Sequence, residues 1–150
     1  MLSVPSRIWA ACAVALLLGC SSAVIRAEDK PTEKSTVLKL DVEQFDRKRH
    51  DSDAVVLDVR TANEFQEGHV PGAVNLDIHD PQFAEKLKAL DKSKTYLVHC
   101  AKGYRSGLAS AQMSKIGFEH LFDFNGGFVS WQAAHKPVEK GAGPTTKPAH

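Results

Sequence analysis

The sequence predicts an α/β domain in which helices flank a central, mainly parallel sheet of five strands. Short apolar segments typical of strands alternate with segments of helical periodicity over residues 37–135. Residues 55–59 are apolar at four of five positions and rich in valine, which is typical of a strand buried on both faces. Residues 96–98 form another apolar run, after which Cys100 and a short loop lead into a small-residue segment of helical spacing. Strands that alternate with helices in this way favour a parallel sheet.

The first strand and helix meet at Asp41. Residues 37–40 have the apolar content of a short strand. Asp41 is a favourable N-cap, because its carboxylate accepts hydrogen bonds from free N–H groups of the first helical turn. The residues that follow, up to Lys48, place Val42 and Phe45 on one face and are expected to form that helix.

The second strand and helix follow in the same order. Residues 55–59 supply the strand, and residues 62–66 supply a short helix. Thr61 stands at the N-cap, and Glu64 three residues later has the spacing of a capping box, in which each side chain binds the other's backbone N–H. Gly68 is expected to end this helix.

A third strand, a third helix and a fourth strand come before the cysteine. Pro71 and Gly72 are typical of a turn, after which residues 73–76 are expected to form a brief strand. Residues 82–90 carry large apolar side chains at helical spacing. Residues 95–99 form the strand that leads to the cysteine.

A helix, a strand and a short helix complete the domain. Residues 106–116 have apolar side chains at i, i+4 and i+7, and residues 120–124 are the last strand. Two glycines precede a final helix that carries Phe128 and Trp131, both expected in the core. Ligands of open parallel sheets bind beyond the carboxyl ends of the strands. Because Cys100 lies at such an end, we expect the functional site there.

The N-terminal segment has the pattern of an export signal. Arg7 precedes the apolar run 8–18, which is too short to span a bilayer comfortably. Residues 17–20, Leu-Leu-Gly-Cys, resemble the lipobox of bacterial lipoproteins. We therefore expect residues 1–19 to be a signal peptide and Cys20 to be the site of lipid attachment.

The polar residues 20–36 are then expected to tether the domain to the lipid. The protein would be exported to the periplasm and anchored to the outer membrane, touching the membrane through its lipid alone. Cleavage after Ala27, a buried N-terminal helix and an uncleaved anchor are the alternatives. At the other end, residues 136–150 are rich in glycine and proline and are expected to form a disordered tail.

The three cysteines support a reactive role for one of them. Cys12 would leave with the signal peptide, and Cys20 would carry the lipid. Cys100 would remain as the single free thiol of an exported protein, with no partner for a structural disulfide.

Composition narrows the classes of function. The chain has 150 residues, of which 43% are hydrophobic and 25% charged, as in one ordinary globular domain. Lys and Arg number 19 against 18 Asp and Glu, without a basic run, so no nucleic-acid partner is expected. The histidines lack the spacing of metal ligands, so neither a metal site nor a cofactor is expected.

Cys100 lies where a thiolate is stabilised. A loop curled over a helix N-terminus points several N–H groups at one spot and adds the positive end of the helix dipole. Lys102 and Arg105 add cationic character. Since the thiolate is the nucleophilic form of cysteine, the sequence predicts a reactive Cys100 rather than a buried, inert one.

Three motifs occur in order along the domain. The first is Leu-Asp-Val-Arg at 57–60, followed by Glu64 and by Gly-His-Val-Pro-Gly-Ala-Val-Asn at 68–75. The second is His-Cys-Ala-Lys-Gly-Tyr-Arg-Ser at 99–106, and the third is Asp-Phe-Asn-Gly-Gly at 123–127 with a later tryptophan. Together they resemble the single-domain rhodaneses, a family of sulfurtransferases. The resemblance implies a small α/β fold and ping-pong transfer of sulfane sulfur through a persulfide on the cysteine.

The resemblance assigns expected roles to the loop. Cys100 is the nucleophile, and the backbone N–H groups of the next five residues ring its persulfide: Ala101, Lys102, Gly103, Tyr104 and Arg105. Gly103 lets the loop curl. Arg105 either binds the anionic end of the donor or braces the loop, and Lys102 either supplies positive potential or is a solvated surface lysine. Tyr104 shapes the entrance.

Residues outside the loop are expected to support it. The resemblance places Asp58 and Arg60 in a structural network with Glu64. His69 is expected to be a hydrogen-bonding brace. His99 is expected to point away from the cysteine, because side chains alternate along a strand.

Sulfur transfer is the function that the resemblance favours. The expected partners are a small donor such as thiosulfate, an acceptor thiol or cyanide, and also a protein acceptor. The alternatives are a persulfide carrier or a partner-binding module of the cell envelope, and a phosphatase or arsenate reductase. The loop from Cys100 to Arg105 spans six residues, one fewer than in related phosphatases, which disfavours the last class.

Overall fold

The structure is a computed structural model that describes residues 36–143. The expected signal peptide, the lipid-attachment residue Cys20 and nearly all of the tether lie outside these residues, as does the end of the expected tail. None of the helices within residues 36–143 is long and apolar enough to cross a membrane.

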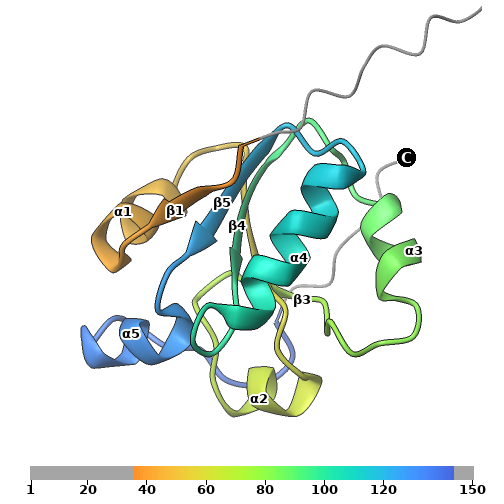
Figure 1. The fold of residues 1–150 in the computed structure, drawn as a ribbon. Coiled ribbons are helices and arrows are strands. Elements are labelled where there is room, and N and C mark those ends of the chain that lie inside the picture. The colour runs from red at the N-terminus through yellow and green to blue at the C-terminus, as the bar shows by residue number, and fades with distance from the viewer. Residues whose placement is uncertain (1–35, 144–150) are drawn as a thin grey trace, which may run out of the picture. The chain divides into compact units, whose positions relative to one another are not determined.

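The described chain forms one five-stranded sheet in which every neighbouring pair is parallel. Its strands are β1 (Leu38–Leu40), β2 (Ala54–Asp58), β3 (Val74–Asn75), β4 (Thr95–His99) and β5 (His120–Phe124). Their order across the sheet is β1-β5-β4-β2-β3, so β4, the strand before Cys100, lies at the centre (Figure 1). The predicted class is therefore confirmed, and the sheet is parallel throughout.

Five helices alternate with the strands. They are α1 (Val42–Lys48), α2 (Ala62–Glu67), α3 (Phe83–Lys88), α4 (Tyr104–Lys115) and α5 (Gly127–Ala133). The expected capping box of Thr61 and Glu64 is present at α2, and Asp41 caps α1 with Gln44 as its partner.

Two apolar clusters fill the two faces of the sheet. One packs α3 and α4 against the sheet and includes Leu87, Met113 and Cys100. The other packs α1, α2 and α5 against the opposite face and includes Phe45 and Trp131. Burial on both faces explains why the central strands are almost continuously apolar.

Residues 136–141 depart from the expectation of disorder after residue 135. Glu139 pairs with His69 through two backbone hydrogen bonds, and the Gly141 N–H donates to the Gln66 carbonyl. The Trp131 indole N–H donates to the Pro137 carbonyl at 2.7 Å. The domain therefore continues past His135, because backbone pairing holds a segment whose composition alone is typical of a tail.

Candidate active site

Cys100 follows the central strand β4 and is 2% exposed. Gly103 takes a φ of 96°, a conformation that glycine adopts without steric cost, and it turns the chain into α4. A strand, a three-residue loop and a helix N-terminus thus meet at the sulfur. α4 begins at Tyr104, two residues earlier than predicted, which places Ser106 in its first turn.

The Cys100 sulfur accepts hydrogen bonds from the loop and the helix start. The Gly103 N–H lies 3.1 Å from Sγ. Burial raises the pKa of the Cys100 thiol, but the N–H and hydroxyl of Ser106 and the N–H groups of Lys102 and Gly103 together outweigh it. The net result is a lowered pKa, which favours the nucleophilic thiolate.

The predicted ring of N–H groups surrounds the persulfide of Cys100 and stays a prediction. Of its five residues, Lys102 and Gly103 contact the Cys100 sulfur itself through their N–H groups. Ser106 was missed, although a helix that starts at residue 104 or at residue 106 leaves its N–H free in the first turn. A serine at this place, whose hydroxyl also reaches the Gly103 carbonyl at 3.1 Å, was the available signal.

The two glycines before α5 bring that helix against the loop. The N–H groups of Phe128 and Val129 donate to the carbonyls of Cys100 and Ala101 at 2.8 and 3.0 Å. A Cβ on Gly127 would lie 2.3 Å from the Cys100 carbonyl oxygen, a distance that no side chain tolerates. Only glycine therefore fits here, and the close approach fixes the loop from behind.

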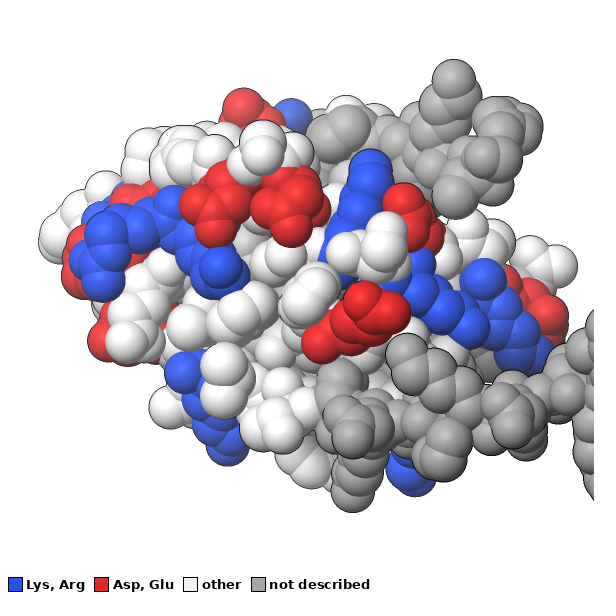
Figure 2. All heavy atoms as spheres, turned by 90° about the horizontal axis from the view of Figure 1, so that it is seen from above, with Lys and Arg blue, Asp and Glu red and all other residues white. Residues whose placement is uncertain are grey.

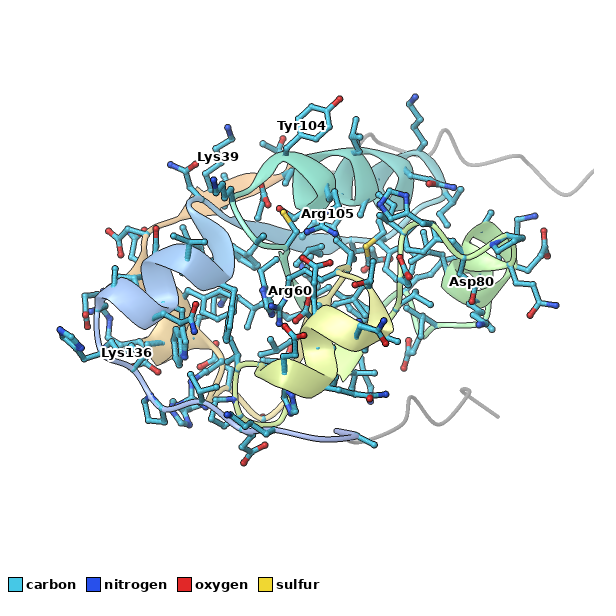
Figure 3. The ribbon with its side chains drawn as sticks, turned by 90° about the horizontal axis from the view of Figure 1, so that it is seen from below. Lys39, Arg60, Asp80, Tyr104, Arg105 and Lys136 are labelled. Carbon is cyan, nitrogen blue, oxygen red and sulfur yellow. The ribbon has the colours of Figure 1, made fainter. Side chains whose placement is uncertain are left out.

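Arg105 braces the loop through Glu64. Its guanidinium donates two hydrogen bonds to the Glu64 carboxylate, at 2.8 and 2.7 Å. These bonds, with Thr61, lower the pKa of Glu64 to about 2 despite partial burial. Of the two roles expected for Arg105 (Figure 3), this geometry is that of the brace. Its hydrogen bond to Glu64 raises the pKa of Arg105, and the nearby charge of Cys100 adds to this effect.

Asp58 and Arg60 form a separate buried ion pair beneath the site. Arg60 donates to both carboxylate oxygens of Asp58 at 2.6–3.0 Å and to the Gly68 carbonyl at 2.7 Å. The expected network with Glu64 is therefore wrong in its connections, because Glu64 binds Arg105 and Thr61 instead. The pair ties β2 to the end of α2 and does not touch the sulfur directly.

The two histidines take the places that were expected. His99 is fully buried on the opposite face of the sheet from Cys100, edge-on to Phe45. His69 is also buried, and its Nδ1 lies 2.9 Å from the Phe65 carbonyl oxygen, as a brace would. Neither side chain is positioned to take a proton from the sulfur.

Asp123 is a buried carboxyl that sequence reasoning missed as part of the site. It lies on β5, and its Oδ1 has no hydrogen-bond partner within residues 36–143. Burial raises the pKa of Asp123. The motif that contains Asp123 was noted, but the strand pattern alone did not show which face it occupies.

Lys102 and Tyr104 stand at the mouth of the loop. Both side chains are exposed, and Tyr104 is 77% exposed. Within the described part of the chain no group of His, Cys, Asp and Glu is arranged to hold a metal ion. The arrangement offers a buried sulfur with a lowered pKa, a nest of donors around it and a solvent-facing entrance.

Comparisons with known proteins agree with this geometry. The chain is 37% identical over 82 residues to thiosulfate sulfurtransferase GlpE of Pseudomonas savastanoi, covering 55% of this chain and 76% of that protein. It is 36% identical over 101 residues to the tRNA uridine(34) hydroxylase of Cytophaga hutchinsonii, covering 65% of this chain but spanning only 32% of that protein's length.

A solved structure extends the likeness to the fold. A rhodanese-related protein of Thermoplasma volcanium superposes with a TM-score of 0.60 at 29% identity, covering 68% of this chain and 97% of that one. The family model described as Rhodanese-like domain matches residues 41–134, which span every helix and strand after β1. This chain belongs to the rhodanese-like domain family.

Proposed function

We propose that this protein is a sulfurtransferase that carries sulfane sulfur on Cys100, from a donor such as thiosulfate to an acceptor such as cyanide or a thiol. The observation that carries the proposal is the donor set around the sulfur. Backbone N–H groups and one hydroxyl hold an anion on a buried cysteine, whose pKa they lower. The likeness to a thiosulfate sulfurtransferase supports thiosulfate as a donor.

The reaction has two balanced steps. The Cys100 thiolate attacks the outer sulfur of thiosulfate, the S–S bond of thiosulfate breaks, and sulfite leaves with the electron pair. The terminal sulfur of the resulting persulfide is then attacked by cyanide, which becomes thiocyanate as Cys100 leaves as a thiolate. Splitting the transfer in this way is covalent catalysis, and each step returns an anion to the same nest of donors.

The residues around the sulfur take distinct parts in these steps. The N–H groups of Lys102 and Gly103 and the two donors of Ser106 stabilise the thiolate and then the persulfide anion. Arg105 holds the loop through Glu64. The exposed ammonium of Lys102 adds positive potential where an anionic donor approaches.

The test is thiosulfate:cyanide sulfurtransferase activity of the purified full-length chain, with intact mass recorded after thiosulfate treatment. We expect a gain of one sulfur atom and thiocyanate production, both lost in Cys100→Ser. Cys20→Ser is the matched control, because it removes a different cysteine and should keep both signals. A folded, reduced protein that gains no sulfur, or that hydrolyses p-nitrophenyl phosphate instead, contradicts the proposal.

We further propose that the chain is exported and lipidated on Cys20. The proposal rests on Arg7, the apolar run 8–18 and the Leu-Leu-Gly-Cys sequence that ends at Cys20. Metabolic labelling with palmitate in a bacterial host should mark the protein and should fail for Cys20→Ala. Labelling that survives this substitution would assign the lipid, and the anchor, to another residue.

A further inference from the structure

Large apolar side chains gather in water around the Cys100 loop. Tyr104 begins α4 and is 77% exposed, and Leu108 one turn later is 52% exposed. Val129 is also exposed and is held beside the loop by its hydrogen bond to Ala101. Apolar surface left in water costs free energy, and a cluster of it at a reacting group is typical of an interaction site.

The segments that form the loop, α4 and α5 carry cations and no acidic residue, since residues 97–118 and 124–138 contain no Asp or Glu. Between them Asp123 is buried and the exposed Glu119 precedes β5, while Glu64 beside the loop is paired with Arg105. Lys39 and Lys102 are exposed, and neither forms an ion pair within residues 36–143. Figure 3 shows Lys39 and Tyr104 projecting outwards on the same side of the domain.

The opposite end of the domain differs. Figure 2, which views the end where the strands begin, shows acidic and basic side chains interspersed. A surface of mixed sign has no preference for a charged partner, whereas the surface at Cys100 attracts acidic groups.

We propose that Tyr104, Leu108, Val129, Lys39 and Lys102 form a docking rim for a protein that takes sulfur from Cys100, and that this partner presents a cysteine flanked by apolar and acidic side chains. The inference rests on the proposed sulfur transfer and names its acceptor. Thiosulfate and cyanide require only the anion nest, and they cannot cover apolar side chains that stand on both sides of the loop.

The burial of the Cys100 sulfur argues against a second copy of this domain as the sulfur acceptor. Cys100 is 2% exposed, so two copies of this domain cannot bring their Cys100 sulfurs together across a flat contact. The partner must instead insert a thiol on a protruding segment. Its thiolate attacks the terminal sulfur of the Cys100 persulfide, the S–S bond to Cys100 breaks, and Cys100 returns as a thiolate while the partner carries the persulfide.

The experiment compares acceptors for the persulfide of the full-length chain. Two synthetic peptides share a central cysteine between leucines and differ only in glutamates or lysines at the outer positions. Rates are corrected for each peptide's thiolate fraction, with cyanide as the small acceptor. We expect the acidic peptide to take sulfur about tenfold faster than the basic one at low salt, with the advantage shrinking as salt screens the charges.

Matched variants locate the effect on the rim. Leu108→Glu and Lys39→Glu should each lose about fivefold or more toward the acidic peptide, with the cyanide rate unchanged. Val138→Glu is the matched apolar control, because Val138 is 40% exposed and lies in the segment after α5, outside the rim. Lys94→Glu is the matched charge control, because Lys94 precedes β4 and Cys100 follows it.

Each outcome decides the inference. Equal rates for the two peptides, or equal losses in rim and control variants, would refute the proposal that the rim binds the acceptor. Sulfur transfer to cyanide would be unaffected by either result. Failure to form the persulfide overturns the proposed function instead, and the two failures are thus distinguishable. A dimer in light scattering that Leu108→Glu dissociates would assign the rim to a second copy of the chain and overturn the acceptor.

Discussion

Replacing Glu64 by glutamine tests whether the ion pair with Arg105 holds the active-site loop. Glutamine keeps the size of the side chain, but only its one oxygen can accept hydrogen bonds, whereas both carboxylate oxygens of Glu64 accept from Arg105 or Thr61. The substitution therefore removes the charge and one of the two acceptors of the bidentate pair. If the brace matters, Glu64→Gln should destabilise the fold at neutral pH.

The magnitude follows from the pKa of Glu64, which falls from 4.5 to about 2 in the folded chain. At about 1.4 kcal/mol per pKa unit, a shift of this size is an upper bound of about 3 kcal/mol. The Glu64 side chain is 34% exposed, so solvent screens part of that interaction. We therefore expect Glu64→Gln to lower the free energy of unfolding by about 1–2 kcal/mol at pH 7.

The dependence on pH is the sharper result. Because the folded pKa lies below the unfolded one, the stabilisation is fully present above about pH 4.5 and is lost as pH falls toward 2. In urea denaturation, the difference between wild type and Glu64→Gln should be constant from pH 7 to 5, and less than half of it should remain at pH 3. Glu67→Gln, in the same helix, is the control and should change stability by less than about 0.5 kcal/mol throughout. A difference that is absent at pH 7, or as large at pH 3 as at pH 7, refutes the reasoning.

Three further substitutions probe the sulfur and its surroundings. Gly127→Ala places a Cβ 2.3 Å from the Cys100 carbonyl oxygen at a φ of 56°, and should lower the free energy of unfolding by about 3 kcal/mol or more. An unchanged melting temperature would contradict this close approach. Ser106→Ala removes the hydroxyl donor and should raise the pKa of Cys100, read from the pH dependence of alkylation by iodoacetamide; an unchanged profile would exclude the hydroxyl from the nest. Asp58→Asn leaves the buried Arg60 without its counter-charge and should destabilise the fold by about 3–5 kcal/mol in urea; a loss below about 1 kcal/mol would mean that the pair is dispensable.

Local patterns were sufficient for most of the fold. The strands β4 and β5 have the predicted bounds, because each is an apolar run limited by polar or glycine-containing segments. The caps Asp41 and Thr61 were predicted correctly, since capping depends on residues within one turn. The start of α4 was misplaced because Gly103, not a side-chain cap, sets it, and a glycine's φ is decided by the surrounding fold.

Contacts between distant segments were beyond sequence reasoning. Glu64 was expected beside Asp58 and Arg60, which are its neighbours in sequence, but it binds Arg105 instead, 41 residues away. The burial of Asp123 depends on which face of β5 meets α4, and a strand with apolar residues on both faces does not reveal this. The segment 136–141 is held by backbone pairing, to which side-chain composition is a poor guide.

The activation of Cys100 comes from hydrogen bonds more than from the charges that the sequence makes conspicuous. Burial raises its pKa, and the groups that reverse this effect are the N–H and hydroxyl of Ser106 and the N–H groups of Lys102 and Gly103. Most of these are backbone groups, so the lysine contributes at the sulfur through its N–H, while its ammonium stands in water. Backbone donors need no side chain to be ordered and keep their aim when the thiolate becomes a longer persulfide. The side chains at the mouth are then free to differ with the acceptor, because the chemistry at the sulfur does not depend on them.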